Sequence, residues 1–136
     1  MTTTLRNKVL LVENDTDMRT LLRVRLEDQG LVCTCANSGN DAAAIFCRES
    51  FDAVVSDLNM PDGDGVRLAS WIRERSRIPL ILISGYKDAY RRWLRDIPDV
   101  TFLHKPFEIV ELVRLVHMTM QRPPIVKGTG ASDADP

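Results

Sequence analysis

The chain has 136 residues, of which 44% are hydrophobic and 27% are charged, and its formal net charge is -1. This length suits one packed domain and leaves no room for a second core. The near-zero charge argues against binding to nucleic acid through a basic surface, and no apolar run approaches the roughly 20 residues that span a bilayer. The polar N-terminus lacks the apolar centre of a signal peptide, so we expect a cytoplasmic protein.

The first third of the chain predicts a strand, a helix and a second strand. Residues 8–12 are predicted to form a strand, since after Lys8 the segment is a continuous apolar run, which is typical of a strand buried on both faces of a parallel sheet. A helix is expected from Asp15 or Thr16 to about Gly30, and residues 31–36 form the next strand. The inner face of the helix is predicted to carry Met18, Leu21, Leu22 and Leu26.

The middle third repeats this alternation. Ser38 is placed to cap a helix, with Asp41 three residues later as an imperfect capping box. Residues 53–57 predict a third strand, which ends in the carboxylate of Asp57. Turn-forming residues follow as far as Gly65, and another helix is then expected. The inner faces of the two helices are predicted to carry Ala42, Ile45 and Phe46 in the first and Val66, Ala69 and Ile72 in the second.

The last third predicts strands at residues 80–84 and 100–103, with a basic, aromatic helix between them. A final helix is expected from near Phe107 to about Gln121. We expect one domain over residues 6–121 and a disordered tail over residues 122–136, which is rich in Gly, Ser and Asp. No output domain is expected to follow Gln121. The cysteines (Cys33, Cys35 and Cys47) are expected to be buried, reduced thiols.

Five strand-helix units imply an α/β fold with a doubly wound parallel sheet, because right-handed crossovers place helices on both faces. Functional sites in such sheets form where the strands end. Polar residues stand at these ends: Glu13, Asn14 and Asp15 after the first strand, then Asp57, Ser84 and Lys105. Clustered acids favour a hard cation such as Mg²⁺, beside which a carboxylate can attack a phosphoryl group. The pattern therefore predicts a site at which an aspartyl phosphate forms.

The motifs around these residues resemble the response-regulator receiver family of two-component signalling. They are Val12-Glu13-Asn14-Asp15, the segment SDLNMPDGDG from Ser56 to Gly65, Ile83-Ser84-Gly85 and His104-Lys105-Pro106-Phe107. The resemblance covers about residues 6–121. It implies the flavodoxin-like receiver fold, a five-stranded parallel sheet in the order 2-1-3-4-5.

The resemblance also implies a role for each matching residue. Asp57 would accept a phosphoryl group from a histidine kinase or a phosphotransfer protein. The ligands of Mg²⁺ would be Glu13, Asn14, Asp57 and the backbone carbonyl of Asn59. The chain would catalyse only its own phosphorylation and dephosphorylation, and its output would pass through a downstream effector protein or a phosphorelay.

Further residues are expected to act around the phosphoryl group. Ser84 takes the position of the switch hydroxyl and Lys105 that of the phosphoryl-binding lysine, with a cis bond to Pro106. Phe102 matches the switch aromatic that turns inward, although a core phenylalanine would explain it equally well. Tyr86 lies at the mouth of the predicted site and either hinders the water that hydrolyses the acyl phosphate or simply faces solvent.

Asn14 departs from the family pattern, which usually has an aspartate at this position. An amide oxygen can still bind Mg²⁺, but the site loses one negative charge, so weaker metal binding and slower phosphorylation are expected. Asp15 could compensate, although a helix cap is the competing role. The departure leaves open an alternative function, a pseudo-receiver that binds partners without phosphorylation. An Asp-nucleophile phosphatase is disfavoured, because such enzymes usually have a second acid where Asn59 stands.

The last helix carries more apolar residues than one inner face requires. Ile109, Leu112, Val113, Val116 and Met120 fall on one face, whereas Phe107, Val110 and Met118 project elsewhere. Surplus apolar surface is typical of a partner contact, so a homodimer through the last helices is one interpretation, and ordinary surface exposure is the other. The arginines at positions 91, 92 and 95 are better explained by a solvated helix face than by nucleic acid.

Overall fold

A computed structural model describes residues 7–61, 64–85 and 95–121. Its element order is β1 (Lys8–Val12), α1 (Thr16–Asp28), β2 (Val32–Ala36), α2 (Gly39–Arg48), β3 (Ala53–Asp57), α3 (Asp64–Arg75), β4 (Leu80–Ser84), β5 (Val100–His104) and α5 (Ile109–Met120). The predicted basic helix lies almost wholly at residues 86–94 and the predicted tail at residues 122–136, both outside the described residues. Every predicted strand is present, with bounds that differ by at most one residue.

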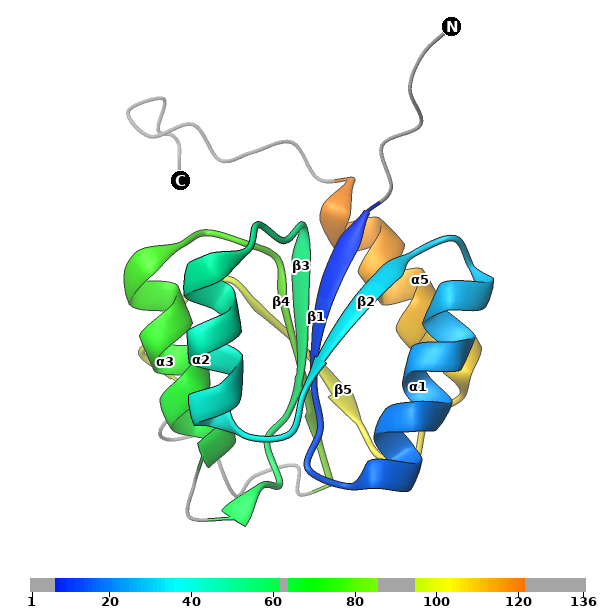
Figure 1. Cartoon of the computed structure of the whole chain (residues 1–136), viewed down its shortest axis with the longest axis horizontal. Helices are drawn as coiled ribbons and strands as arrows, with labels where there is room; N and C mark the ends of the chain where they lie inside the picture. Colours follow the sequence, from blue (N-terminus) through cyan, green and yellow to red (C-terminus); the bar gives the residue numbers. More distant parts are fainter. Residues whose placement is uncertain (1–6, 62–63, 86–94, 122–136) are drawn as a thin grey trace, which may run out of the picture.

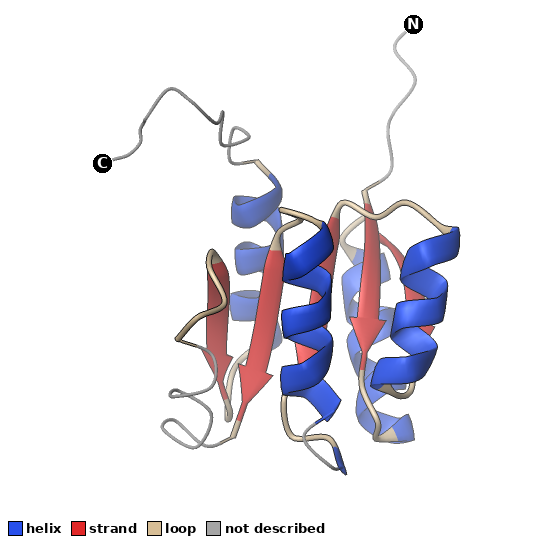
Figure 2. Cartoon of the chain, turned by 90° about the vertical axis from the view of Figure 1, so that its left-hand side faces the viewer, coloured by secondary structure: helices blue, strands red, loops and turns tan. Residues whose placement is uncertain are grey.

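The strands form one parallel sheet in the order β2-β1-β3-β4-β5, which confirms the predicted topology. Helices α2 and α3 cover one face of the sheet, and α1 and α5 cover the other (Figure 1). All strand pairs are parallel, and the strand arrows that can be seen in Figure 2 point the same way, so the carboxyl ends of the strands share one edge. The described N-terminal start and the end of α5 lie at the opposite edge.

Two apolar clusters hold the sheet between the helix layers. The central strands contribute alternate residues to each cluster, because successive side chains of a strand point to opposite faces. On the side of α2 and α3 these are Leu10, Val12, Val54, Leu80 and Leu82, and on the side of α1 and α5 they are Val9, Leu11, Val55, Ile81 and Ile83. All ten are at most 2% exposed, as expected for strands that are buried on both faces.

Helix α2 begins directly after its predicted capping residue, Ser38. The Ser38 hydroxyl accepts from the backbone N–H of Asp41, while the Asp41 carboxylate accepts from the N–H of Asn37, so the capping box is displaced by one residue. Helix α5 begins at Ile109, two residues later than expected, after Glu108, whose N–H donates to the Glu111 carboxylate.

Three expectations about burial are wrong. Leu21 is 43% exposed, because the buried stripe of α1 runs through Leu22 and Leu26. Phe107 precedes α5 and packs against the cluster on that side of the sheet instead of projecting away from it. Cys47 is exposed, and Cys33 and Cys35 are only half-buried on the α1 face of the edge strand β2, although all three cysteines are free, as predicted.

Val110 and Met118 project from α5 as predicted and are 59% and 56% exposed. Among the residues that the structure describes, no helix combines the length and the apolar character needed to cross a membrane.

Candidate functional site

The sheet register aligns the four strand ends that carry the predicted site residues. Asp57 pairs with Ile83, and the following N–H, that of Leu58, donates to the Ile83 carbonyl at 2.8 Å. On the next strand pair, Ser84 is opposite His104, and the N–H of Lys105 donates to the Ser84 carbonyl at 2.9 Å. Backbone hydrogen bonds therefore bring residues that are distant in sequence to one edge of the sheet.

Asp57 is buried at the centre of this edge, with 3% of its surface exposed. Its Oδ1 atom accepts a hydrogen bond from the N–H of Asn59 at 2.8 Å, and its Oδ2 atom lies 3.2 Å from the Nζ atom of Lys105. Both carboxylate oxygens thus have a donor, and Lys105 supplies the positive charge that a buried carboxylate requires. The bond between Lys105 and Pro106 is cis, as predicted.

Glu13 is the second acid of the site and is 4% exposed. The pKa of its carboxyl is raised from 4.5 to about 7, mainly by burial and in addition by the adjacent Asp57, against the opposing effects of the Asp15 N–H and Lys105. The Oε2 atom of Glu13 accepts from the Asp15 N–H at 2.9 Å, and its backbone carbonyl accepts from the Arg19 guanidinium at 2.8 Å. The loop between β1 and α1 is therefore held by one hydrogen bond to the side chain of Glu13 and one to its backbone.

Asn14 and Asp15 have different environments from Glu13. Both are exposed. The Oδ1 atom of Asp15 accepts from the N–H of Asp17 at 3.1 Å and caps α1, so its carboxylate serves the helix. The structure therefore favours capping over the compensation for Asn14 that the sequence left open.

The oxygen donors at this edge fit a hard cation. Glu13 and Asp57 provide carboxylates, and the side-chain Oδ1 of Asn59 is buried with no hydrogen-bond partner. Carboxylate and amide oxygens are the ligands that Mg²⁺ prefers. No group of three or more His, Cys, Asp or Glu side chains with metal-binding geometry occurs within residues 7–61, 64–85 and 95–121.

Two of the residues predicted to respond to phosphorylation, Ser84 and Phe102, lie on neighbouring strands and differ in exposure. Ser84 is buried at the end of β4, on the same edge as Asp57. Phe102 is 39% exposed on β5, so it is not a core phenylalanine in this conformation. Tyr86 lies outside the described residues, and its predicted effect on hydrolysis stays a prediction.

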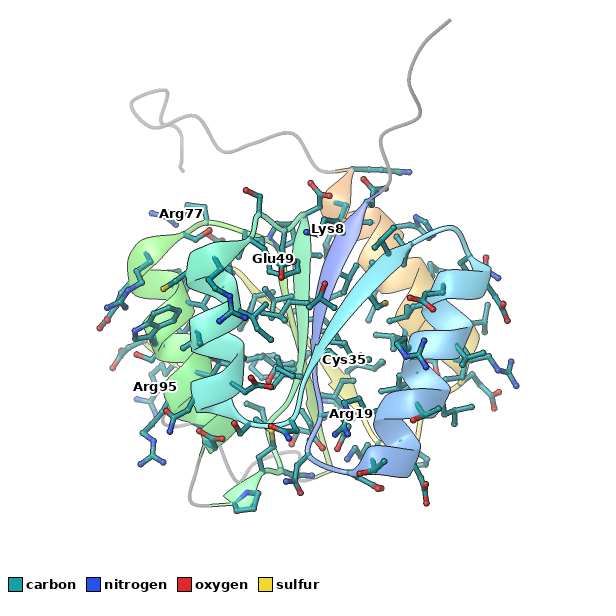
Figure 3. All side chains as sticks on the ribbon, in the orientation of Figure 1. Lys8, Arg19, Cys35, Glu49, Arg77 and Arg95 are labelled. Atoms are coloured by element: carbon teal, nitrogen blue, oxygen red, sulfur yellow. The ribbon has the colours of Figure 1, made fainter. Side chains whose placement is uncertain are left out.

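Sequence reasoning missed two residues that hold the loops of the site. Arg19 donates to the Glu13 carbonyl, and Asp64 accepts from the N–H of Gly39. Figure 3 labels Arg19 near the strand ends, whereas the ion pair of Lys8 and Glu49 lies at the opposite end of the sheet. Asp64 belongs to the motif SDLNMPDGDG. The sequence signal that could have identified its role is an acidic residue in the first turn of a helix.

Comparisons with known proteins identify the family to which this chain is similar. The family model of the response regulator receiver domain matches residues 9–117. The chain is 34% identical over 125 residues to an uncharacterised 14.6 kDa protein of Leptolyngbya boryana, with 85% of this chain and 92% of that protein covered. It is 33% identical over 118 residues to the DNA-binding transcriptional regulator NtrC of Salmonella typhimurium, with 82% of this chain but only 24% of that protein covered.

Solved structures show the same architecture. The receiver domain of Francisella response regulator 1452 superposes with a TM-score of 0.77 at 27% identity, covering 85% of this chain and 98% of that one. The chemotaxis response regulator CheY4 of Vibrio cholerae gives a TM-score of 0.76 at 24% identity, covering 85% and 99%, and supports the fold alone. From the family match over most of its length, together with the shared fold, the chain belongs to the response regulator receiver domain family.

Proposed function

We propose that this receiver domain is a signalling switch that accepts a phosphoryl group on Asp57 from a histidine kinase or a phosphotransfer protein. The observation that carries the proposal is the contact of 3.2 Å between Lys105 Nζ and Asp57 Oδ2 next to the buried Glu13. A buried nucleophile, a cation and a second acid from three separate strand ends are what the chemistry needs.

In the proposed reaction, a carboxylate oxygen of Asp57 forms a bond to phosphorus, and the bond from phosphorus to the donor's leaving atom breaks. Bound Mg²⁺, held by Glu13, Asp57, Asn14 and Asn59, would neutralise charge on the phosphoryl oxygens. Lys105 contacts the Asp57 carboxylate before transfer and can contact a phosphoryl oxygen afterwards. Ser84 would donate its hydroxyl hydrogen to another phosphoryl oxygen.

Phosphorylation would act by shifting a conformational equilibrium. New negative charge at Asp57 gives Lys105 and Ser84 a different partner, and ordering of these two side chains favours one state of the surrounding surface. The exposed Phe102 is the proposed reporter of that state, and it moves inward when Ser84 shifts.

The output would be a protein partner that recognises the phosphorylated surface, or a phosphotransfer protein that takes the phosphoryl group onward. The exposed Val110 and Met118 of α5 support a contact through this helix, and a second copy of the chain is one candidate partner. Sedimentation velocity with and without acetyl phosphate tests for self-association, which Val110→Glu should weaken.

Incubation with acetyl phosphate and Mg²⁺, followed by intact mass spectrometry, tests the proposed acceptor. We expect a mass gain of one phosphoryl group that is absent in Asp57→Ala and after chelation of the metal. The alternative function is a pseudo-receiver that binds partners without phosphorylation, and it is motivated by Asn14. A wild-type chain that gains no mass under these conditions would reject the switch in favour of this alternative.

A further inference from the structure

We propose that Asp64 is a positioning residue that connects the amino end of α2 to the backbone of the phosphoryl acceptor. This inference rests on the proposed function and extends it to residues outside the reacting groups. The connection runs from Gly39 through Asp64 and Gly65 to the peptide between Asp57 and Leu58.

The first contact lies between two helices. The Oδ2 atom of Asp64, in the first residue of α3, accepts a hydrogen bond from the N–H of Gly39, in the first residue of α2, although 25 positions separate them. A Cβ atom on Gly39 would overlap the Asp64 carboxylate and would lie 2.8 Å from its Cγ atom. The carboxylate is therefore packed directly against the Gly39 backbone.

The electrostatic setting favours an acid at this place. Gly39 and Asp64 begin their helices, so the carboxylate lies at the amino ends of α2 and α3. The free N–H groups there carry partial positive charge, which stabilises a nearby anion. A bond between an ionised acceptor and a backbone N–H is stronger than a neutral one, so it can hold the start of α3 in place.

The second contact transmits this position to the acceptor. Gly65 is buried, and a Cβ atom there would lie 2.6 Å from the Asp57 carbonyl oxygen and 2.7 Å from Leu58 Cα. Because the first turn of α3 touches this peptide without a spacer, a shift of Asp64 displaces the backbone next to the nucleophile. The same peptide leads to Asn59, whose N–H binds Asp57 Oδ1.

Misplacement of reacting groups is costly, since a shift of about 1 Å can reduce a rate about a hundredfold. Loss of the Asp64 contact would loosen the start of α3. The backbone hydrogen bonds donated by Leu58 and Asn59 would remain. We therefore expect a smaller effect, a rate of phosphorylation about tenfold lower, with no group removed from the reaction itself.

The experiment compares Asp64→Ala, Asp64→Asn and Gly39→Ala in the full chain, with Ser38→Ala as the matched control. Ser38→Ala removes the hydroxyl cap of α2 but leaves Asp64 in place. The readouts are the rate of phosphorylation by acetyl phosphate with Mg²⁺ and the amide NMR shifts of Leu58 and Asn59 in metal-free protein.

The proposal predicts that Asp64→Ala and Gly39→Ala slow phosphorylation about tenfold and shift both amides. Asp64→Asn should stay within about twofold of the wild-type rate, because its amide oxygen still accepts from Gly39. Adding Gly39→Ala to Asp64→Ala should cause no further loss, since the two residues act through one contact. The Ser38→Ala rate should be unchanged.

Two results would overturn the connection. One is a wild-type rate with unshifted Leu58 and Asn59 amides in Asp64→Ala, and the other is an equal loss of rate in Ser38→Ala. If Gly39→Ala does not fold, the comparison of Asp64→Ala with Asp64→Asn decides. A wild-type chain that is not phosphorylated contradicts the proposed function, whereas the amide shifts in Asp64→Ala still test the connection by themselves.

Discussion

The Nζ atom of Lys105 lies 3.2 Å from the Oδ2 atom of Asp57, and the two side chains differ greatly in exposure, at 34% for the lysine and 4% for the aspartate. The carboxylate depends on its partner more than the ammonium group does, because only the aspartate is shielded from water. This asymmetry leads to the first prediction.

Lys105→Met should destabilise the metal-free protein by about 1–2 kcal/mol, less than for a fully buried pair because the lysine is partly solvated. The variant leaves the Asp57 carboxylate buried without its cation. Urea unfolding at pH 7.5 in the presence of a chelator measures the change. Addition of Mg²⁺ should restore part of the loss. Equal stability of the variant and the wild type in chelator would show that the pair contributes nothing.

Glu13 should make stability depend on pH in the metal-free protein. Its pKa is raised from 4.5 to about 7 in the folded state, mainly by burial. Between these pKa values the folded state binds more protons than the unfolded state. The contribution of Glu13 to the free energy of unfolding is therefore fully present at low pH and is lost as the pH rises through this window. One proton corresponds to a slope of at most about 1.4 kcal/mol per pH unit.

Glu13→Gln isolates this contribution, since an amide does not titrate. Urea unfolding of both proteins from pH 5 to pH 8 in chelator should give a wild-type stability that falls relative to the variant. A difference that stays constant, or that grows in favour of the wild type as the pH rises, contradicts the burial argument. With Mg²⁺ present the wild-type trend should weaken, because the cation favours the ionised carboxylate.

Asn14→Asp should strengthen Mg²⁺ binding by about tenfold, because it adds a full negative charge among hard oxygen ligands. Isothermal titration calorimetry measures the affinity directly. Asp15→Asn is the matched control, because it removes a charge from the next residue, whose carboxylate caps α1. An affinity that changes more in the control than in Asn14→Asp would assign the metal ligand to Asp15 instead.

Arg73 should be a major contributor to stability at the end of the sheet opposite the site. Its guanidinium donates to the backbone carbonyls of Pro98, Ser76, Ile78 and Asp99 at 2.8–2.9 Å. Burial lowers its pKa from the usual value, against the opposing effect of Asp99. Arg73→Ala should cost about 2–4 kcal/mol in the free energy of unfolding, because several carbonyls lose a charged donor.

Arg77→Ala is the control for this prediction. Arg77 forms an ion pair with the Asp99 carboxylate at 3.1 Å, but its side chain is 53% exposed and that of Asp99 is 44% exposed. Such exposed pairs contribute at most about 1 kcal/mol. Urea unfolding of both variants should therefore separate them clearly, and equal losses would mean that the bonds from Arg73 to the backbone carry little of the stability.

The sequence alone determined the order of the elements and the edge of the sheet at which the site forms. Residues 8–12, 53–57 and 80–84 are mainly apolar segments too short for helices, and their alternation with helical patterns indicates a parallel sheet. In such a sheet every strand ends at the same edge, so Glu13, Asp57, Ser84 and Lys105 could be grouped without coordinates. Local patterns carry this information because they depend only on near neighbours.

Only the tertiary structure decided how those groups interact. The raised pKa of Glu13 comes from burial beside Asp57, which is 44 positions away in the sequence (57 minus 13), and no local pattern specifies it. The exposure of Leu21 and Phe102 depends on which neighbouring element covers each face. The contact of Asp64 with Gly39 arises where two helices begin side by side. Burial, charge coupling and helix packing are sums over the folded neighbourhood, so they exist only once the chain is folded.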